Sequence, residues 1–337
     1  MDGRRVDGAI RLAGDARQRF HDARGIGRVI DGETIELTWI EAAYLLDRGD
    51  LSAVDGLGRT AFFADPPDPT AITRWLVYRD LRERGYYVAP AYPPGEPPRT
   101  LAPSLHVKPR GADPTTDDIA HRVAVLPETA TVTVGELTSM AIAIVDDEAE
   151  VTYLEGTNWE PDGSCSLPDC QPITGHVQGR WVHVTERSPL YERAFFGQPI
   201  GDNESMHVLT LLEATYLEDR NQLTIAAKSR SLDDAIDIDS PHFEATNHVY
   251  ETLRDAGMVP RSGLKFGTTF RVYDSFDSVE SPGHSSALVD VVDPDDQTTP
   301  RSLSGAVRLA TGVRKTYVMA IVAEETIDWL ALQRLTP

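Results

Sequence analysis

An internal repeat is the feature of this sequence that most restricts its fold. The segment Leu37–Leu51 aligns without gaps on Leu209–Leu223, and nine of the fifteen aligned positions are identical. The same offset of 172 residues continues through a second segment, in which Val77, Tyr78, Leu81, Arg82 and Gly85 recur as Val249, Tyr250, Leu253, Arg254 and Gly257. A register kept over two separate segments is typical of a duplicated chain. The sequence therefore predicts two homologous halves.

Each half is expected to begin with helices and to end in strands. A Thr-x-x-Glu capping box precedes an amphipathic segment at 38–41 and again at 210–213. Apolar residues four apart predict helices over about 74–84 and 246–256, each followed by a glycine at the helix C′ position. The predicted fold is α/β (α+β), each repeat having a helix-rich N-terminal subdomain and a small mixed-sheet subdomain. The predicted boundaries are 1–84 and 85–155 for the first repeat, 156–173 for a linker, and 174–257 and 258–337 for the second repeat.

The strand pattern is clearest in the second half. Alternation predicts a strand over 268–273, with Phe270 and Val272 facing the core and Tyr273 on the opposite, displayed face. Buried strands are predicted over 287–292 and 317–322, and a short helix that stops at Gly312 is predicted over 303–311.

The two halves differ in their polar residues. The apolar strand at 140–145 corresponds to 317–322, and counting back from it places Thr138 opposite Lys315. The counterpart of 270–273 is expected in the proline-rich segment 91–98, where no aligned tyrosine occurs. Both halves keep the scaffold, but only the second keeps this set of polar residues. Such a pattern indicates one working copy and one degenerate copy. Neutral divergence of surface residues is the alternative.

Composition does not exclude a nucleic-acid partner. The 337 residues carry a formal net charge of -21, which ordinarily argues against binding phosphates. However, all but four of the 32 basic residues are arginine, and the acidic residues are scattered along the chain. An acidic, lysine-poor surface is typical of proteins from concentrated salt, where a short Debye length mutes self-repulsion. The net charge then reflects the habitat of the organism, and a local arginine cluster can still bind phosphate.

Targeting and metal-binding patterns are not found in the sequence. No apolar run approaches the ~18 residues that cross a bilayer, and no apolar leader follows the N-terminus, so we expect a cytoplasmic protein without a membrane partner. Cys165 and Cys170, the two cysteines of the chain, match neither a zinc framework nor a disulfide scaffold, and we interpret them as loop residues.

Three polar residues of the second half lie in segments that resemble a known family. Tyr273 ends the segment 266–273, His284 lies in 283–289, and Lys315 lies in 308–318. These segments, FGTTFRVY, GHSSALV and RLATGVRKTYV, resemble motifs of the archaeal tRNA-splicing endonucleases and occur in the order found in that family. Together with the duplication, they are similar to the two-repeat form, which works as a homodimer.

The resemblance implies a site, a substrate and an architecture. The catalytic triad would be Tyr273, His284 and Lys315, and the mixed-sheet subdomains would be nuclease-like, the first of them degenerate. The substrate would be an intron-bearing precursor tRNA folded as a bulge-helix-bulge, and neither a cofactor nor a metal would be needed.

These residue types suit RNA cleavage by an internal nucleophile. Attack of a ribose 2′-OH on the adjacent phosphorus needs a base, an acid for the departing 5′ oxygen, and a cation for the charge of the transition state. We hypothesise that Tyr273 is the base, that His284 as imidazolium is the acid, and that Lys315 stabilises the charge. The products would carry a 2′,3′-cyclic phosphate and a 5′-hydroxyl.

The resemblance also implies contacts with RNA and with a second subunit. The family holds splayed bulge bases between two arginines, and Arg308 matches one of them by motif position, whereas Arg334 is a weaker match. Asp146, Asp147 and Glu148 form an acidic turn where the family has a loop that docks on the other subunit. Solvated surface residues are the alternative interpretation for Arg334 and for this turn.

Two other functions compete with this interpretation. Asp290, Asp293 and Asp295 lie at and beyond the end of a predicted strand, where carboxylates could hold Mg²⁺ in a metal-dependent nuclease. Alternatively, the chain is a catalytically inactive RNA-binding or structural subunit. The presence of tyrosine, histidine and lysine together in one half argues against the second alternative.

Overall fold

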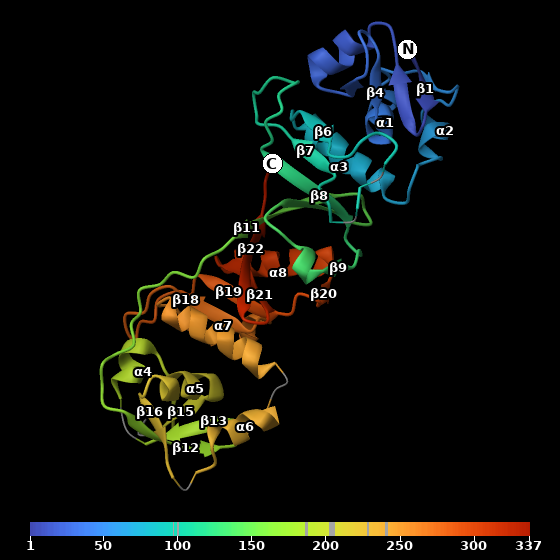
Figure 1. Cartoon of the computed structure of the whole chain (residues 1–337). Coiled ribbons are helices and arrows are strands. Elements are labelled where there is room, and N and C mark those ends of the chain that lie inside the picture. Colours follow the sequence, from blue (N-terminus) through green and yellow to red (C-terminus); the bar gives the residue numbers. More distant parts are fainter. Residues whose placement is uncertain (97, 100, 186–187, 202–205, 228, 240–241) are drawn as a thin grey trace. The chain divides into compact units, whose positions relative to one another are not determined.

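The computed structural model describes residues 1–96, 98–99, 101–185, 188–201, 206–227, 229–239 and 242–337 (Figure 1). The chain divides into two compact units. The first comprises Met1–Thr157, Asp295–Arg308 and Leu332–Pro337, and the second comprises Asn158–Pro294 and Leu309–Ala331. No described helix is both long and apolar enough to span a membrane.

The N-terminal part of each half contains a five-stranded sheet that the sequence analysis did not predict. In the first half the strands are β1 (Asp2–Val6), β2 (Ala9–Leu12), β3 (Arg28–Val29), β4 (Ile35–Leu37) and β5 (Ala53–Val54), in the order β3-β4-β2-β1-β5. In the second half they are β12 (Ile173–Gln178), β13 (Trp181–Val184), β14 (Gln198–Ile200), β15 (Met206–Thr210) and β16 (Leu223–Ile225), in the order β14-β15-β13-β12-β16. The two orders are the same topology, so the duplication extends to the sheets.

Helices accompany these sheets, and they include the predicted ones. The first half has η1 (Arg17–Asp22), α1 (Trp39–Asp47), α2 (Arg59–Phe63) and α3 (Ala71–Glu83), and the second has α4 (Pro189–Ala194), α5 (Leu211–Asp219), α6 (Leu232–Asp239) and α7 (Phe243–Asp255). The capping boxes at the starts of α1 and α5 are both confirmed. Gly85 and Gly257 follow α3 and α7 with φ of 87° and 78°, the left-handed conformation expected at C′.

A mixed sheet completes each half. In the first, β6 (Val88–Pro90), β7 (Leu105–Val107), β8 (His121–Pro127), β10 (Ala141–Val145) and β11 (Val151–Asn158) follow one another across the sheet, and β9 (Val132–Thr133) and η2 (Val134–Glu136) lie outside it. In the second, the order is β17 (Val259–Ser262), β18 (Phe270–Tyr273), β19 (Ala287–Val292), β21 (Thr316–Ala323) and β22 (Thr326–Arg334), with η3 (Leu264–Phe266), β20 (Gln297–Thr298) and α8 (Pro300–Gly312) in the connections.

The long helices α3 and α7 are equivalent elements of the two halves, and each packs in the hydrophobic core of its half. Helix α3 packs on α1 and on β8 and β10, while α7 packs on α5 and on β17, β19 and β21. Four of their inward residues, Tyr78, Leu81, Tyr250 and Leu253, are at most 2% exposed. Apolar burial of this kind is the main favourable contribution to folding. Each helix therefore joins the N-terminal subdomain of its half to the mixed sheet.

The segment 295–308 of the second half belongs to the first compact unit. Strand β20 pairs with β9, where Gln297 lies opposite Thr133. At the start of α8, Arg301 donates to both carboxylate oxygens of Glu128, at 2.6 and 3.0 Å. The start of helix α8 is thus held to the first half by strand pairing and by an ion pair.

Candidate active site

Three strand ends place the predicted triad at one edge of the second mixed sheet. Strands β18 and β19 are antiparallel, with Val272 beside Ala287, and β19 and β21 are parallel, with Ala287 beside Thr316. Tyr273 ends β18, and the residues that directly precede β19 and β21 contain His284 and Lys315. The register therefore brings together three segments that are separated in the sequence.

Hydrogen bonds outside the strands extend this arrangement. The amide of Ser286 donates to the carbonyl of Val272 at 2.8 Å, and the amide of Thr316 donates to the carbonyl of Ser286 at 2.9 Å. The Lys315 ammonium donates to the carbonyl of Ser285 at 2.7 Å. The amine of Lys315 is thus fixed to the residue that follows His284.

The end of α8 sets the direction of Lys315. The helix ends at Gly312 as predicted, but the left-handed residue of its terminus is Arg314, with φ of 58°. The amide of Lys315 then donates to the carbonyl of Ala310 at 2.9 Å, which satisfies one of the last carbonyls of the helix. This turn leads the chain directly into β21.

The structure differs from the sequence prediction in the exposure of Tyr273. The tyrosine was expected on a displayed face, yet it is only 5% exposed, and its ring packs with Phe195 and Val259. His284 is exposed, whereas the neighbouring Ser285 is buried. A residue from the N-terminal subdomain covers the face of β18 that the alternation pattern assigned to solvent.

The electrostatic surroundings of Lys315 favour loss of its proton. Partial burial, and secondarily the positive charge of Arg271, lower the pKa of the Lys315 ammonium. The guanidinium of Arg271 also lies 5.8 Å from the centre of the Tyr273 ring, so it belongs to the same edge of the sheet.

We expect a titration followed by NMR to show this shift. The chain has four lysines, so protein labelled at the lysine ε-carbon gives a simple spectrum, and Lys315→Arg identifies the signal of Lys315. That signal should titrate below the ordinary value of about 10.4. Arg271→Gln should move the midpoint upward, because removing a like charge favours the charged amine. A midpoint at or above 10.4 that Arg271→Gln leaves in place would contradict the prediction.

The equivalent edge of the first half carries different residues. Val107 of β7 pairs with His121 of β8, just as Val272 pairs with Ala287, and each of these pairs ends its antiparallel ladder. Val107 is therefore equivalent to Val272, and His121 to Ala287. By this alignment Lys108 stands for Tyr273 and Asp118 for His284. Continuing the parallel register of β8 and β10 by two residues gives Thr138 for Lys315, the position inferred from the sequence.

The counterpart of 270–273 was predicted in the wrong place. It is β7, which lies beyond the proline-rich segment 91–98 in which it was expected. The connection between β6 and β7 is long, whereas β17 and β18 are joined by the short segment that holds η3. An insertion in the first half therefore displaced the sequence alignment.

The predicted RNA-binding arginines and acidic turn lie in the first compact unit. Arg308 on α8 and Arg334 at the end of β22 are both exposed. The acidic turn joins β10 to β11, and its Asp146 carboxylate accepts hydrogen bonds from the amides of Glu148 and Glu150. Asp147 and Glu148 are exposed. The first carboxylate thus shapes the turn, and the other two face solvent.

The aspartates of the metal-dependent alternative do not form a described metal site. Asp290 lies within β19, where its carboxylate accepts hydrogen bonds from the amide of Thr269 at 3.0 Å and the hydroxyl of Tyr317 at 3.0 Å. Burial raises the pKa of Asp290. Among the residues that the structure describes, no group of three or more histidine, cysteine or acidic side chains is placed to hold a metal ion.

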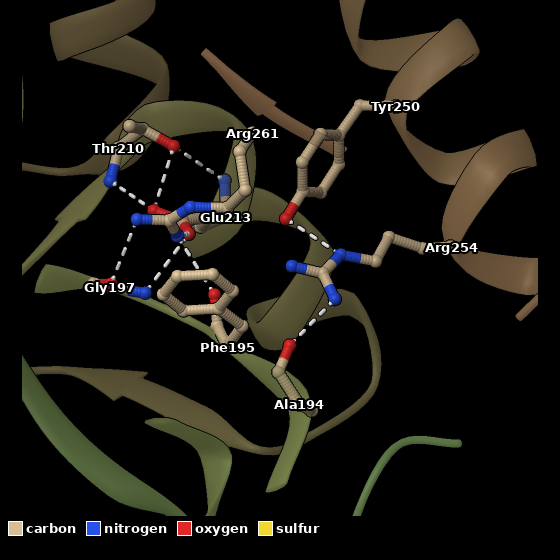
Figure 2. A network of polar contacts seen from close by, with 8 residues as sticks. All are labelled: Ala194, Phe195, Gly197, Thr210, Glu213, Tyr250, Arg254 and Arg261. Atoms are coloured by element: carbon tan, nitrogen blue, oxygen red, sulfur yellow. Dashed lines mark hydrogen bonds and ion pairs between the residues drawn. The ribbon is translucent and has the colours of Figure 1, made fainter. Parts of the chain in front are cut away.

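A polar network around Phe195 was not predicted from the sequence (Figure 2). Arg261 donates to the Glu213 carboxylate at 2.7 Å, to the carbonyl of Phe195 at 2.8 Å and to the carbonyl of Gly197 at 3.2 Å. Glu213 belongs to the capping box of α5, which the sequence predicted. Its ion pair with Arg261 of β17 joins residues far apart in the chain, so local spacing could not predict it.

The linker also contacts this region. The amide of Ser164 donates to the carbonyl of Asp274 at 2.9 Å, and the amide of Cys165 donates to the carbonyl of Gly257 at 2.8 Å. Cys165 and Cys170 are free thiols. Burial raises the pKa of Cys165, which keeps the thiol protonated near neutral pH. The linker thus lies between the end of α7 and the residue after Tyr273.

Comparison with known proteins agrees with the duplicated architecture. Residues 1–63 and 173–235 both match the model of the tRNA intron endonuclease N-terminal domain, and residues 243–329 match the model of the tRNA intron endonuclease catalytic C-terminal domain. The tRNA-splicing endonucleases of Natronomonas pharaonis and Haloferax volcanii are 40% and 41% identical to this chain over the full length of both proteins. That of Methanosarcina barkeri is 33% identical over 95% of each chain. This chain therefore belongs to the tRNA-splicing endonuclease family.

Proposed function

We propose that this protein excises introns from precursor tRNA by cutting bulge-helix-bulge RNA. The observation that carries the proposal is the edge of the second mixed sheet, where the segments of Tyr273, His284 and Lys315 meet. The first half has Lys108, Asp118 and Thr138 in the equivalent places, a set without the same acid, base and cation. The second half then cleaves the RNA, and the first half has a structural role in the assembly.

The proposed reaction is an internal transesterification. The Tyr273 phenolate takes the proton of the ribose 2′-OH, and the 2′ oxygen forms a bond to phosphorus. The bond from phosphorus to the 5′ oxygen breaks, and His284 as imidazolium gives that oxygen a proton. Lys315 faces the negative charge that gathers on the phosphate oxygens. The RNA ends are a 2′,3′-cyclic phosphate and a 5′-hydroxyl, and the reaction uses no cofactor.

The assembly we propose is a homodimer. Arg308 and Arg334 stack on bulge bases, because a guanidinium plane suits a splayed base. Asp147 and Glu148 present two exposed charges at the tip of the β10–β11 turn, which suits docking on a basic groove of a second subunit. The cytoplasmic location expected from the sequence stays a prediction.

Incubation of the protein with a bulge-helix-bulge RNA in high salt and EDTA tests the reaction. We expect cleavage in both bulges, unchanged by the chelator, with a 2′,3′-cyclic phosphate and a 5′-hydroxyl at each new end. Dephosphorylation-resistant 3′ ends and direct 5′ labelling by a kinase identify these groups.

The same experiment separates the alternatives. Loss of cleavage in EDTA with recovery on adding Mg²⁺ would favour the metal-dependent nuclease. Tight binding of the bulged RNA without cleavage in either condition would favour an inactive RNA-binding subunit.

A further inference from the structure

The backbone at Phe195 is unusual for a residue of its size. Phe195 follows α4 with φ of 57° and ψ of 37°, the left-handed conformation. An L-residue with a Cβ pays a steric cost there, and glycine is the usual occupant. A large residue in this conformation persists only where its surroundings hold it, and such positions concentrate at functional sites. The contacts of the Phe195 side chain are therefore of interest.

The first half provides the matched comparison. The amides of Phe195 and Phe196 donate to the carbonyls of Tyr191 and Leu190, and the amides of Gly25 and Ile26 make the same two bonds, to His21 and Phe20. Gly25 also has the left-handed conformation, with φ of 60°. The same helix end therefore occurs in both halves, with the unstrained glycine in the half that lacks the triad and phenylalanine in the half that has it.

The space beside the two residues is used differently. A Cβ atom built on Gly25 would lie 2.2 Å from the carbonyl oxygen of Pro114, so the first half has no room for a side chain. In the second half the Phe195 ring stacks on Phe276 at 4.9 Å and meets the Tyr273 ring edge-on at 6.3 Å between centres. Within the described part of the chain, the side-chain contacts of Tyr273 are made by its ring.

Arg261 and Glu213 hold Phe195 in place. The guanidinium of Arg261 lies 4.3 Å from the centre of the Phe195 ring and donates to the Phe195 carbonyl, so it fixes both the ring and the backbone (Figure 2). Glu213 is buried and accepts from Arg261, from the amide of Gly197 and from Thr210. The β17 register places Ala89 of the first half where Arg261 stands, so the first half has neither this arginine nor the tyrosine, and its Gly25 carbonyl accepts from Arg82 at 3.2 Å.

We propose that Phe195 is a positioning residue that sets the orientation of the Tyr273 phenol, and that Arg261 and Glu213 clamp it. This inference rests on the proposed function, in which Tyr273 is the general base. A base must lie within hydrogen-bond reach of the proton it removes, and a displacement of about 1 Å can cost about 100-fold in rate. The N-terminal subdomain of the second half thereby takes part in building the active site.

Phe195→Gly tests the proposal because it removes the ring and relaxes the backbone. Under single turnover, we expect the cleavage rate constant to fall about 10- to 100-fold, while the Kd for bulge-helix-bulge RNA changes less than about twofold. Phe195→Tyr, which keeps the ring, should restore most of the rate. Added to Tyr273→Phe, the glycine substitution should cause no further loss, because residues that act through one group are not additive.

Phe196→Leu is the matched control. Phe196 is also buried, but its ring stacks on Tyr216 and lies 3.9 Å below the Arg254 guanidinium. This variant should lower the Tm by an amount comparable to Phe195→Gly and leave the rate constant of the folded enzyme unchanged. Equal rate losses in the two variants, or a further loss from Phe195→Gly in the Tyr273→Phe background, would assign Phe195 a merely structural role.

A measurement without substrate keeps this inference separate from the proposed function. In protein labelled at the tyrosine ring, Tyr273→Phe identifies the Tyr273 signal. Phe195→Gly should change its chemical shift and line width, because the edge-on ring is lost, and Phe196→Leu should not. An unchanged Tyr273 signal in Phe195→Gly would overturn the inference even if the wild type cuts RNA. Failure of the wild type to cut would count against the proposed function alone.

Discussion

Replacing His284 by alanine should lower the rate constant for cleavage of bulge-helix-bulge RNA by about 10² to 10⁴, the range for one general acid or base. The imidazole is exposed at the edge where β18, β19 and β21 meet, so a substrate phosphate can approach it. Its removal leaves the departing 5′ oxygen without a proton donor. The methyl group of alanine disturbs little of the fold, because the side chain it replaces lies in solvent. Single-turnover cleavage measures the loss.

Two comparisons make this result specific. RNA binding by His284→Ala should stay close to that of the wild type, because a proton donor contributes mainly in the transition state. Asp118→Ala changes the equivalent position of the first half and should keep the wild-type rate within about twofold, since that half carries no triad. Equal losses of binding and cleavage in His284→Ala, or a comparable loss in Asp118→Ala, would contradict the assignment of the acid.

The features that the sequence predicted best depend on near neighbours along the chain. Capping boxes, apolar residues four apart and terminal glycines involve contacts within one or two helical turns, and α1, α3, α5 and α7 follow from them. The strands β18, β19 and β21 were also predicted, because each is a continuous or alternating apolar run. Local pattern and tertiary packing agree in these elements.

The features that the sequence missed depend on residues far apart. The N-terminal sheets contain strands as short as two residues, such as β3 and β5, which are too short to show a period. The burial of Tyr273 depends on Phe195, which reaches β18 from the end of α4. The equivalence of Gly25 and Phe195 lies at an offset of 170 residues, two short of the repeat register, so it is seen only in the matching hydrogen bonds of the two helix ends. The resemblance of three segments to the family therefore located the triad, but it did not show which residues hold the triad in place.

The duplication also supplies the second large prediction, a pair of substitutions at equivalent helix ends. Gly257→Ala should lower the free energy of unfolding by about 2–5 kcal/mol, as the left-handed conformation costs an alanine roughly 1–2 kcal/mol and displacing packed backbone costs about 1–3 kcal/mol more. The second cost arises because a Cβ on Gly257 would lie 2.6 Å from the carbonyl oxygen of Gly163 in the linker. Denaturant or thermal unfolding in constant high salt measures the loss.

Gly85→Ala isolates the conformational part of that loss. Gly85 has the same left-handed conformation, with φ of 87°, but a Cβ there meets nothing within 4 Å. It should cost only about 1–2 kcal/mol. The difference between the two variants then reports the fit of the linker against α7, beside the hydrogen bond from Ser164 to Asp274. Equal losses would contradict the prediction, because they would mean that Gly163 of the linker moves away from the end of α7 without a cost in stability.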